Sequence, residues 1–151
     1  MKKAGAIKLT MDQSSAYEEE EIVVKYNEMS HTLDNLVNQI KLYSSSIVGK
    51  RGSSSYTILL SDIYYFESVE NKTFIYVSDG EYEVDLKLYE IEEQLNKIGF
   101  IRISKFCILN LDRLTRVKGM LNGKFEAYLD NGEKVIITRH YAPEFKKRFG
   151  L

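Results

Sequence analysis

Apolar and polar residues alternate at several places along the chain, which is the pattern of β-strands with one buried face. The clearest instance is 100–110, F-I-R-I-S-K-F-C-I-L-N, in which the alternation stops at Lys105 and an apolar run, 106–109, follows. We predict a strand that turns a corner at Lys105 and leaves its ammonium group outside the sheet. The single cysteine, Cys107, lies inside the apolar run, so we expect it to be buried and unreactive.

The first 50 residues have a different pattern. Residues 1–21 are polar and end in an acidic run that we expect to be solvated, and the hexamer 21–26 (E-I-V-V-K-Y) predicts a short strand. Apolar residues recur with a helical period over 32–43, and this helix is too short to be stable unless it packs on the main body or on a partner chain. The predicted stripe is Leu33, Leu36, Val37, Ile40 and Tyr43. Residues 49–55 (G-K-R-G-S-S-S) predict a flexible turn, which ends an α/β appendage of residues 1–50.

From residue 56 onward the pattern is mainly β. Asp79-Gly80, Asn122-Gly123 and Asn131-Gly132 lie between strand-like segments, and such pairs favour tight hairpins. One helix is inserted after Asp85, which we expect to cap it, and a short helix follows Pro143 near the end. Predicted strands include 63–68, 73–78, 81–84, 114–117, 125–129 and 135–137. The fold class predicted is a mainly β meander of antiparallel strands with one inserted helix and helical ends.

Composition and charge narrow the class of protein. A chain of 151 residues with 44% hydrophobic residues suits one domain, or one domain with an appendage. The net charge of −1 conceals a segregation, because residues 1–96 hold nine basic and seventeen acidic residues and residues 97–151 hold twelve and five. This distribution favours either a basic face that binds a polyanion or neutralisation of one half by the other. We find no signal peptide or membrane-spanning run, and with one cysteine we expect a cytoplasmic protein.

Motifs for metal binding, nucleotide binding or nucleophilic catalysis do not occur in the sequence. We therefore expect no enzyme activity, no metal site, no cofactor and no small-molecule substrate. What remains are basic and polar residues at the ends of predicted strands, where binding residues usually lie. These are Lys72, Thr73, Ser104, Lys105, Lys118, Lys124, Thr138, Arg139 and His140.

Residues 56–151 resemble the LytTR DNA-binding domain of bacterial response regulators. Five segments carry the resemblance in order: 62–68 (D-I-Y-Y-F-E-S), the hairpin through Asp79-Gly80, 88–95 (L-Y-E-I-E-E-Q-L), 100–110, and 130–139 (D-N-G-E-K-V-I-I-T-R). The resemblance implies an elongated β-β-β fold, in which a few antiparallel sheets are stacked lengthwise with a small helix. It also implies that loops from the sheets enter successive major grooves of promoter DNA.

The resemblance further implies which residues contact DNA. The three base-reading loops of the family correspond to Thr73 with Lys72 beside it, to Lys105, and to Arg139. The corner motif R-I-S-K departs from the R-x-H-R usual in the family, and Thr73 stands where a histidine or lysine is common. Arg139 is suited to bidentate recognition of guanine. Ser104 and His140 would donate to phosphates, and Lys118 and Lys124 are proposed from charge alone.

The first 50 residues lack the pattern of a phosphoacceptor receiver domain, so the chain resembles the small stand-alone LytTR regulators. That resemblance implies double-stranded DNA as a partner and a membrane protein encoded alongside as a regulator. We further expect residues 1–50 to mediate homodimerisation. Two alternatives stay open: a protein-interaction module whose basic face meets an acidic partner, and, with less support, an RNA-binding protein.

Overall fold

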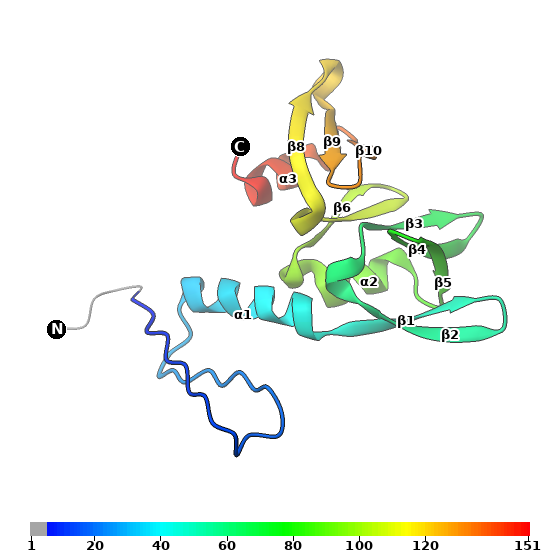
Figure 1. The fold of residues 1–151 in the computed structure, drawn as a ribbon. Coiled ribbons are helices and arrows are strands. Elements are labelled where there is room, and N and C mark those ends of the chain that lie inside the picture. The colour runs from blue at the N-terminus through cyan, green and yellow to red at the C-terminus, as the bar shows by residue number, and fades with distance from the viewer. Residues whose placement is uncertain (1–5) are drawn as a thin grey trace. The chain divides into compact units, whose positions relative to one another are not determined.

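The structure is a computed structural model that describes residues 6–151 and forms two units, one ending at Val37 and one comprising Asn38–Leu151. The helices are α1 (His31–Ser44), α2 (Leu88–Leu95) and α3 (Ala142–Phe149). The strands are β1 (Ser46–Arg51), β2 (Ser54–Leu59), β3 (Tyr65–Val69), β4 (Lys72–Val77), β5 (Gly80–Val84), β6 (Phe100–Ser104), β7 (Cys107–Asn110), β8 (Leu114–Gly119), β9 (Phe125–Leu129) and β10 (Lys134–Ile137) (Figure 1). The prediction of a mainly β protein is confirmed. Among the described residues, no helix is long and apolar enough to span a membrane.

Residues 6–30 adopt turns and irregular backbone, followed by α1. The helix confirms the prediction for 32–43, but the strand predicted at 21–26 is wrong. Ile22 and Val23 are 70% and 64% exposed, and the hexamer pairs with no other strand in the described chain. High β propensity alone does not make a strand, because the backbone groups need a partner strand and the side chains need a surface to pack on.

The larger unit contains a seven-stranded antiparallel sheet with the order β2-β1-β5-β4-β3-β7-β6. Its first hairpin, β1–β2, covers most of the segment 49–55 for which we predicted a flexible turn, and only Gly52 and Ser53 form the turn. Lys50 of β1 pairs with Glu83 of β5, so β1 belongs to the sheet. The appendage boundary predicted at residue 50 thus falls inside a strand, whereas the two units divide between residues 37 and 38.

The last turn of α1 packs into the first of two hydrophobic clusters through Leu42, which is fully buried. Leu42 was not in the predicted stripe, whereas Tyr43 was, and Tyr43 is 60% exposed with its hydroxyl donating to Asp112 at 2.8 Å. The stripe was therefore displaced by one residue at this end. Phe66, Ile75, Ile91 and Phe100 complete the centre of the cluster between the sheet and α2.

Helix α2 has the predicted position, but its N-terminal boundary differs in detail. The cap residue is Lys87, whose backbone N–H donates to the Glu90 carboxylate at 3.0 Å. Asp85 instead forms an ion pair with Lys50. Gly99 ends the helical segment with φ of 115°, a value that glycine adopts without steric cost, as predicted from its position after the last apolar residue.

Strands β6 and β7 form a tight antiparallel hairpin, which replaces the predicted corner. Ser104 pairs with Cys107, so Lys105 and Phe106 alone make the turn, and Lys105 lies outside the sheet as expected. Residues 107–109 of the apolar run lie in β7, and their side chains enter both hydrophobic clusters. A strand covered on both faces shows no alternation, which explains why the sequence pattern suggested a corner. Cys107 is buried as predicted, and burial raises the pKa of its thiol.

The three-stranded sheet has the order β10-β9-β8, and Figure 1 shows α3 beside it. Its hairpins turn at the two Asn-Gly pairs, as predicted: Asn122 has φ of 69° and Gly132 has φ of 87°. Phe145 of α3 is fully buried in the second cluster and stacks on Phe149 at 5.4 Å between ring centroids. This cluster joins the three-stranded sheet to β6 and β7.

Candidate nucleic-acid interface

Three loops that are far apart in sequence meet at one edge of the larger unit. Glu67 of β3 pairs with Cys107 of β7, and just beyond this pair the Ser68 N–H donates to the Phe106 carbonyl at 2.8 Å. On the other side of the β6–β7 hairpin, the Thr138 N–H donates to the Ile103 carbonyl at 2.9 Å. The β3–β4 turn, the β6–β7 turn and residues 138–140 are therefore neighbours, and together we call them the loop edge.

The first part of the loop edge is the β3–β4 turn. Glu70 and Asn71 have φ of 51° and 66°, which is the backbone of a two-residue hairpin turn of the type that matches strand twist. Lys72 follows it and is exposed. Thr73 is only 5% exposed, because it pairs with Val84 and shares the buried face of β4. Thr73 is thus not placed to contact a base, contrary to the expectation from the resemblance, whereas Lys72 is exposed together with the turn residues Glu70 and Asn71.

The second part is the β6–β7 turn, whose backbone is held by hydrogen bonds from Arg102. The Arg102 guanidinium donates to the Ser104 carbonyl at 2.9 Å and to the Lys105 carbonyl at 2.6 Å, and it lies 3.7 Å from the Glu92 carboxylate. The Ser104 hydroxyl oxygen accepts from the Phe106 N–H at 3.2 Å, so its proton stays available for an acceptor such as a phosphate. The backbone of the turn is therefore fixed while the Lys105 side chain extends from it.

The third part surrounds Arg139. A shallow hollow is lined by Asn122, Lys124, Thr138, Arg139 and His140, all neutral or basic residues. The aliphatic stem of Arg139 lies over Gly123, where an added Cβ would be 3.0 Å from its Cγ. His140 is exposed and its ring packs edge-on against Tyr141, with centroids 4.8 Å apart. The structure thus brings Lys124, Arg139 and His140 together at one site, as an anion would require.

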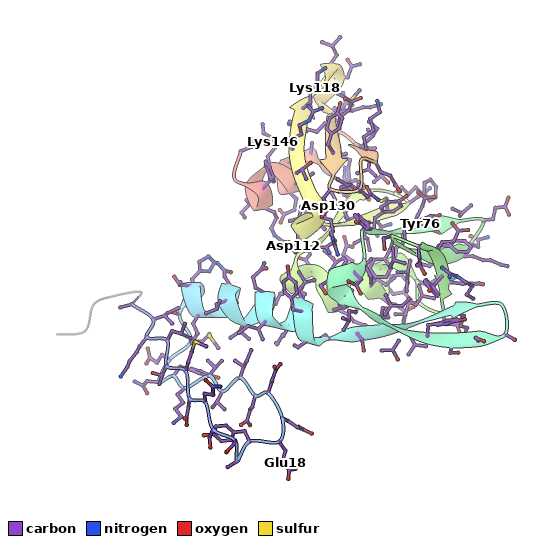
Figure 2. All side chains as sticks on the ribbon, in the orientation of Figure 1. Glu18, Tyr76, Asp112, Lys118, Asp130 and Lys146 are labelled. Carbon is purple, nitrogen blue, oxygen red and sulfur yellow. The ribbon has the colours of Figure 1, made fainter. Side chains whose placement is uncertain are left out.

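Lys118 lies elsewhere, on the outer face of the three-stranded sheet. It pairs with Glu126, and the pKa of that carboxyl is lowered by a hydrogen bond from Tyr128 and by the charges of Lys134 and Lys118. Figure 2 shows Lys118 toward one end of β8, with Asp112 and Asp130 at the other end. The charge of Lys118 is partly balanced by Glu126, and Lys118 does not line the hollow around Arg139.

Sequence reasoning missed three residues that lie in the loop edge or contact it: Asn122, Phe106 and Arg102. Asn122 was identified only as a turn residue, and Phe106 was assigned to the apolar run although it is 55% exposed. Arg102 was counted as part of the basic segment, yet its side chain is 16% exposed and bound to carbonyl groups. No signal in the sequence separates Phe106 from the buried residues that follow it in the apolar run.

The site and fold are those of a β scaffold that presents basic loops, and comparisons with known proteins agree. The profile of the family described as LytTr DNA-binding domain matches residues 53–150. The sensory transduction protein LytT of Enterococcus faecalis is 31% identical over 96 residues, which are 64% of this chain and 40% of that protein. An uncharacterized HTH-type transcriptional regulator of Staphylococcus aureus is 28% identical over 127 residues, covering 84% of this chain and 85% of that protein.

A solved structure is also similar: the LytTr DNA-binding domain of a response regulator from Bacillus cereus. It superposes with a TM-score of 0.68 and 26% identity, covering 71% of this chain and 98% of the solved chain. This chain belongs to the LytTR DNA-binding domain family. It is therefore a DNA-binding protein related to transcriptional regulators.

Proposed function

We propose that this protein is a bacterial transcription regulator that binds promoter DNA sequence-specifically in the cytoplasm through the loop edge. The observation that carries the proposal is the backbone hydrogen bonding of Ser68 to Phe106 and of Thr138 to Ile103. These two bonds place Lys72, Lys105 and Arg139 in a row, although 67 positions of sequence separate the first from the last. A row of cations on a stiff sheet suits one face of a duplex.

The length of this row fits two adjacent major grooves. Neighbouring strands lie about 4.8 Å apart, so the four steps from β4 through β3, β7 and β6 to Thr138 cover roughly 19 Å. Extended side chains at both ends add several ångströms each, which approaches the ~34 Å that separates successive major grooves on one face. Lys72 and Arg139 would enter these two grooves, and Lys105 would face the minor groove between them.

The chemistry of each side chain suggests its role. Arg139 presents a planar donor pair that matches O6 and N7 of guanine, and its stem is braced on Gly123. Lys124, His140 and the Ser104 hydroxyl would donate to phosphates, which fixes the orientation of the protein without reading sequence. Lys72 takes the role that the resemblance assigned to Thr73, because Lys72 is exposed.

The test is binding to duplexes selected from random DNA, measured by fluorescence anisotropy against a scrambled duplex at several salt concentrations. Arg139→Ala should weaken binding to the selected duplex by about 10- to 100-fold, as expected for loss of ~1–3 kcal/mol of base discrimination. Lys124→Ala should weaken binding to both duplexes and reduce the slope of log affinity against log salt by about 1. Arg116→Ala is the matched control, because Arg116 stacks on Tyr128 at 3.7 Å, away from the loop edge.

The alternative, a protein-interaction module that binds an acidic partner, makes the opposite prediction. Such a module would not distinguish the selected duplex from the scrambled one, and Arg139→Ala would have no effect on discrimination. Either result would remove the proposed function.

We also propose that the N-terminal segment mediates homodimerisation and that a membrane protein encoded alongside controls the regulator. The helix α1 supports the first proposal, because its apolar residue Leu36 is 45% exposed. Deleting residues 1–37 spares β1, and the truncated chain should change from dimer to monomer in sedimentation experiments. An unchanged oligomeric state would exclude this segment. Co-expression of the neighbouring membrane protein should lower occupancy of the selected DNA.

A further inference from the structure

The turn between β6 and β7 carries an apolar side chain that the fold does not use. Phe106 is 55% exposed, whereas the residues that follow it in β7 are buried. Neither hydrophobic cluster includes it. Its side chain is accompanied by that of Lys105, whose ammonium nitrogen lies 5.5 Å from the ring centroid.

The backbone of Phe106 is held from both sides. Its N–H donates to the Ser104 hydroxyl at 3.2 Å, and its carbonyl accepts from the Ser68 N–H at 2.8 Å. The Arg102 guanidinium fixes the carbonyls of the two residues before it. A large aromatic ring therefore projects from a rigid point in the middle of the loop edge, between Lys72 and Arg139.

We infer that Phe106 is a wedge that enters the minor groove, partly unstacks one base-pair step and bends the DNA. This inference rests on the proposed function, in which the outer loops occupy successive major grooves and the middle turn faces the minor groove between them. Apolar side chains inserted from the minor groove kink duplexes by about 20–90° toward the major groove. A bend in that direction moves the flanking DNA away from the middle turn, so only a kink near the lower end of this range leaves the basic side chains at both ends of the edge in reach of their grooves.

Lys105 and Phe106 would act together at this position. The lysine neutralises phosphate repulsion across the minor groove, and the ring supplies the apolar surface that replaces part of the lost base stacking. The cost of unstacking is lowest at flexible pyrimidine–purine steps such as TA and CA. The regulator should therefore prefer such a step at the centre of its site, a preference that needs no hydrogen bond to a base.

The experiment measures DNA bending by the full chain. A duplex selected for wild-type binding is labelled at both ends, and energy transfer between the labels reports the bend. Wild-type protein should bend the duplex, Phe106→Ala should bind with little bend, and Phe106→Leu should restore most of it because leucine is also a wedge. Tyr89→Ala is the control, since Tyr89 is a comparably exposed aromatic residue (62%) on α2.

A second measurement protects the test against a folding defect. A mismatch at the central step lowers the unstacking cost, so it should raise the affinity of the wild type several-fold and that of Phe106→Ala hardly at all. Equal bending by wild type and Phe106→Ala would overturn the wedge, as would specific binding without any bend. If Phe106→Ala bends the DNA normally but no longer distinguishes thymine from uracil, Phe106 contacts a thymine methyl in the major groove and the wedge is wrong. Failure of the wild type to prefer the selected duplex would overturn the proposed function itself.

Discussion

Gly123 offers the sharpest test of the position of Arg139. This residue has φ of 74°, and an added Cβ would lie 3.0 Å from Cγ and 3.3 Å from Cδ of Arg139. Gly123→Ala therefore has two separate consequences. The left-handed backbone costs alanine about 1–2 kcal/mol, reduced by roughly 0.4–1 kcal/mol from the lower entropy of the unfolded chain. The methyl group also forces the arginine stem to move by a few tenths of an ångström.

The control variant separates these consequences. Gly132 has a similar φ of 87° in the next hairpin, but an added Cβ there meets no atom within 4 Å. Gly132→Ala should lose about the same stability, near 1 kcal/mol, and keep full DNA binding. Gly123→Ala should lose that stability and also about tenfold in affinity for the selected duplex, because a displaced guanidinium keeps only part of its ~1–3 kcal/mol of base recognition.

The assays are urea unfolding for stability and anisotropy with the selected and scrambled duplexes for binding. In the Arg139→Ala background, Gly123→Ala should have no further effect on discrimination, because its effect is transmitted through that side chain. Equal binding by Gly123→Ala and Gly132→Ala would refute the reasoning. A further loss of discrimination in the double variant would show that the glycine acts by another route.

Three other variants test the scaffold and the loop edge. Arg102→Gln should destabilise the fold by only about 1–2 kcal/mol in urea unfolding, because water can replace its bonds to surface carbonyls, yet it should weaken binding in the anisotropy assay because the turn that carries Ser104, Lys105 and Phe106 is no longer held; unchanged binding would contradict this role. Phe145→Ala should cost about 3–5 kcal/mol in urea unfolding, since the ring is fully buried; a loss below 1 kcal/mol would contradict the assigned core. The pKa of Tyr65 is raised by burial and by its 2.9 Å bond to Glu133, so the unfolded chain loses this proton first and stability should fall as the pH rises above about 10. Tyr65→Phe should flatten that part of the pH profile, and an unchanged slope would contradict the assignment.

Local turn chemistry made much of the fold predictable. The Asn-Gly pairs favour hairpin turns by their own backbone preferences, so the β8–β9 and β9–β10 turns appear where the sequence places them, whereas the β4–β5 turn falls on Ser78 and Asp79, one residue before the predicted Asp79-Gly80 pair. The inserted helix and its end at Gly99 follow from periodicity and a left-handed residue in the same way. The prediction of a strand at 21–26 was wrong because a strand needs a partner strand, and nothing in the hexamer itself reveals that this partner is missing.

The candidate site was predictable in part. Lys105 and Arg139 came from the resemblance, and their loops are neighbours in the structure. The expectation that Thr73 contacts DNA was not met, because neighbouring residues of a strand lie on opposite faces. The sequence could not say which of Lys72 and Thr73 faces inward. Phe106 was missed because a strand buried on both faces makes an apolar run whose first residue looks like the rest.

The sequence by itself determined most of the strands and turns after residue 56, because these depend on side-chain periodicity and on preferences within a few residues, and its resemblance to a known family indicated the class of protein. The tertiary structure decided which loops share an edge, which cations are balanced by a carboxylate and which aromatic ring stays outside the core. Those outcomes depend on strand order, and strand order is set by packing between segments that are far apart along the chain.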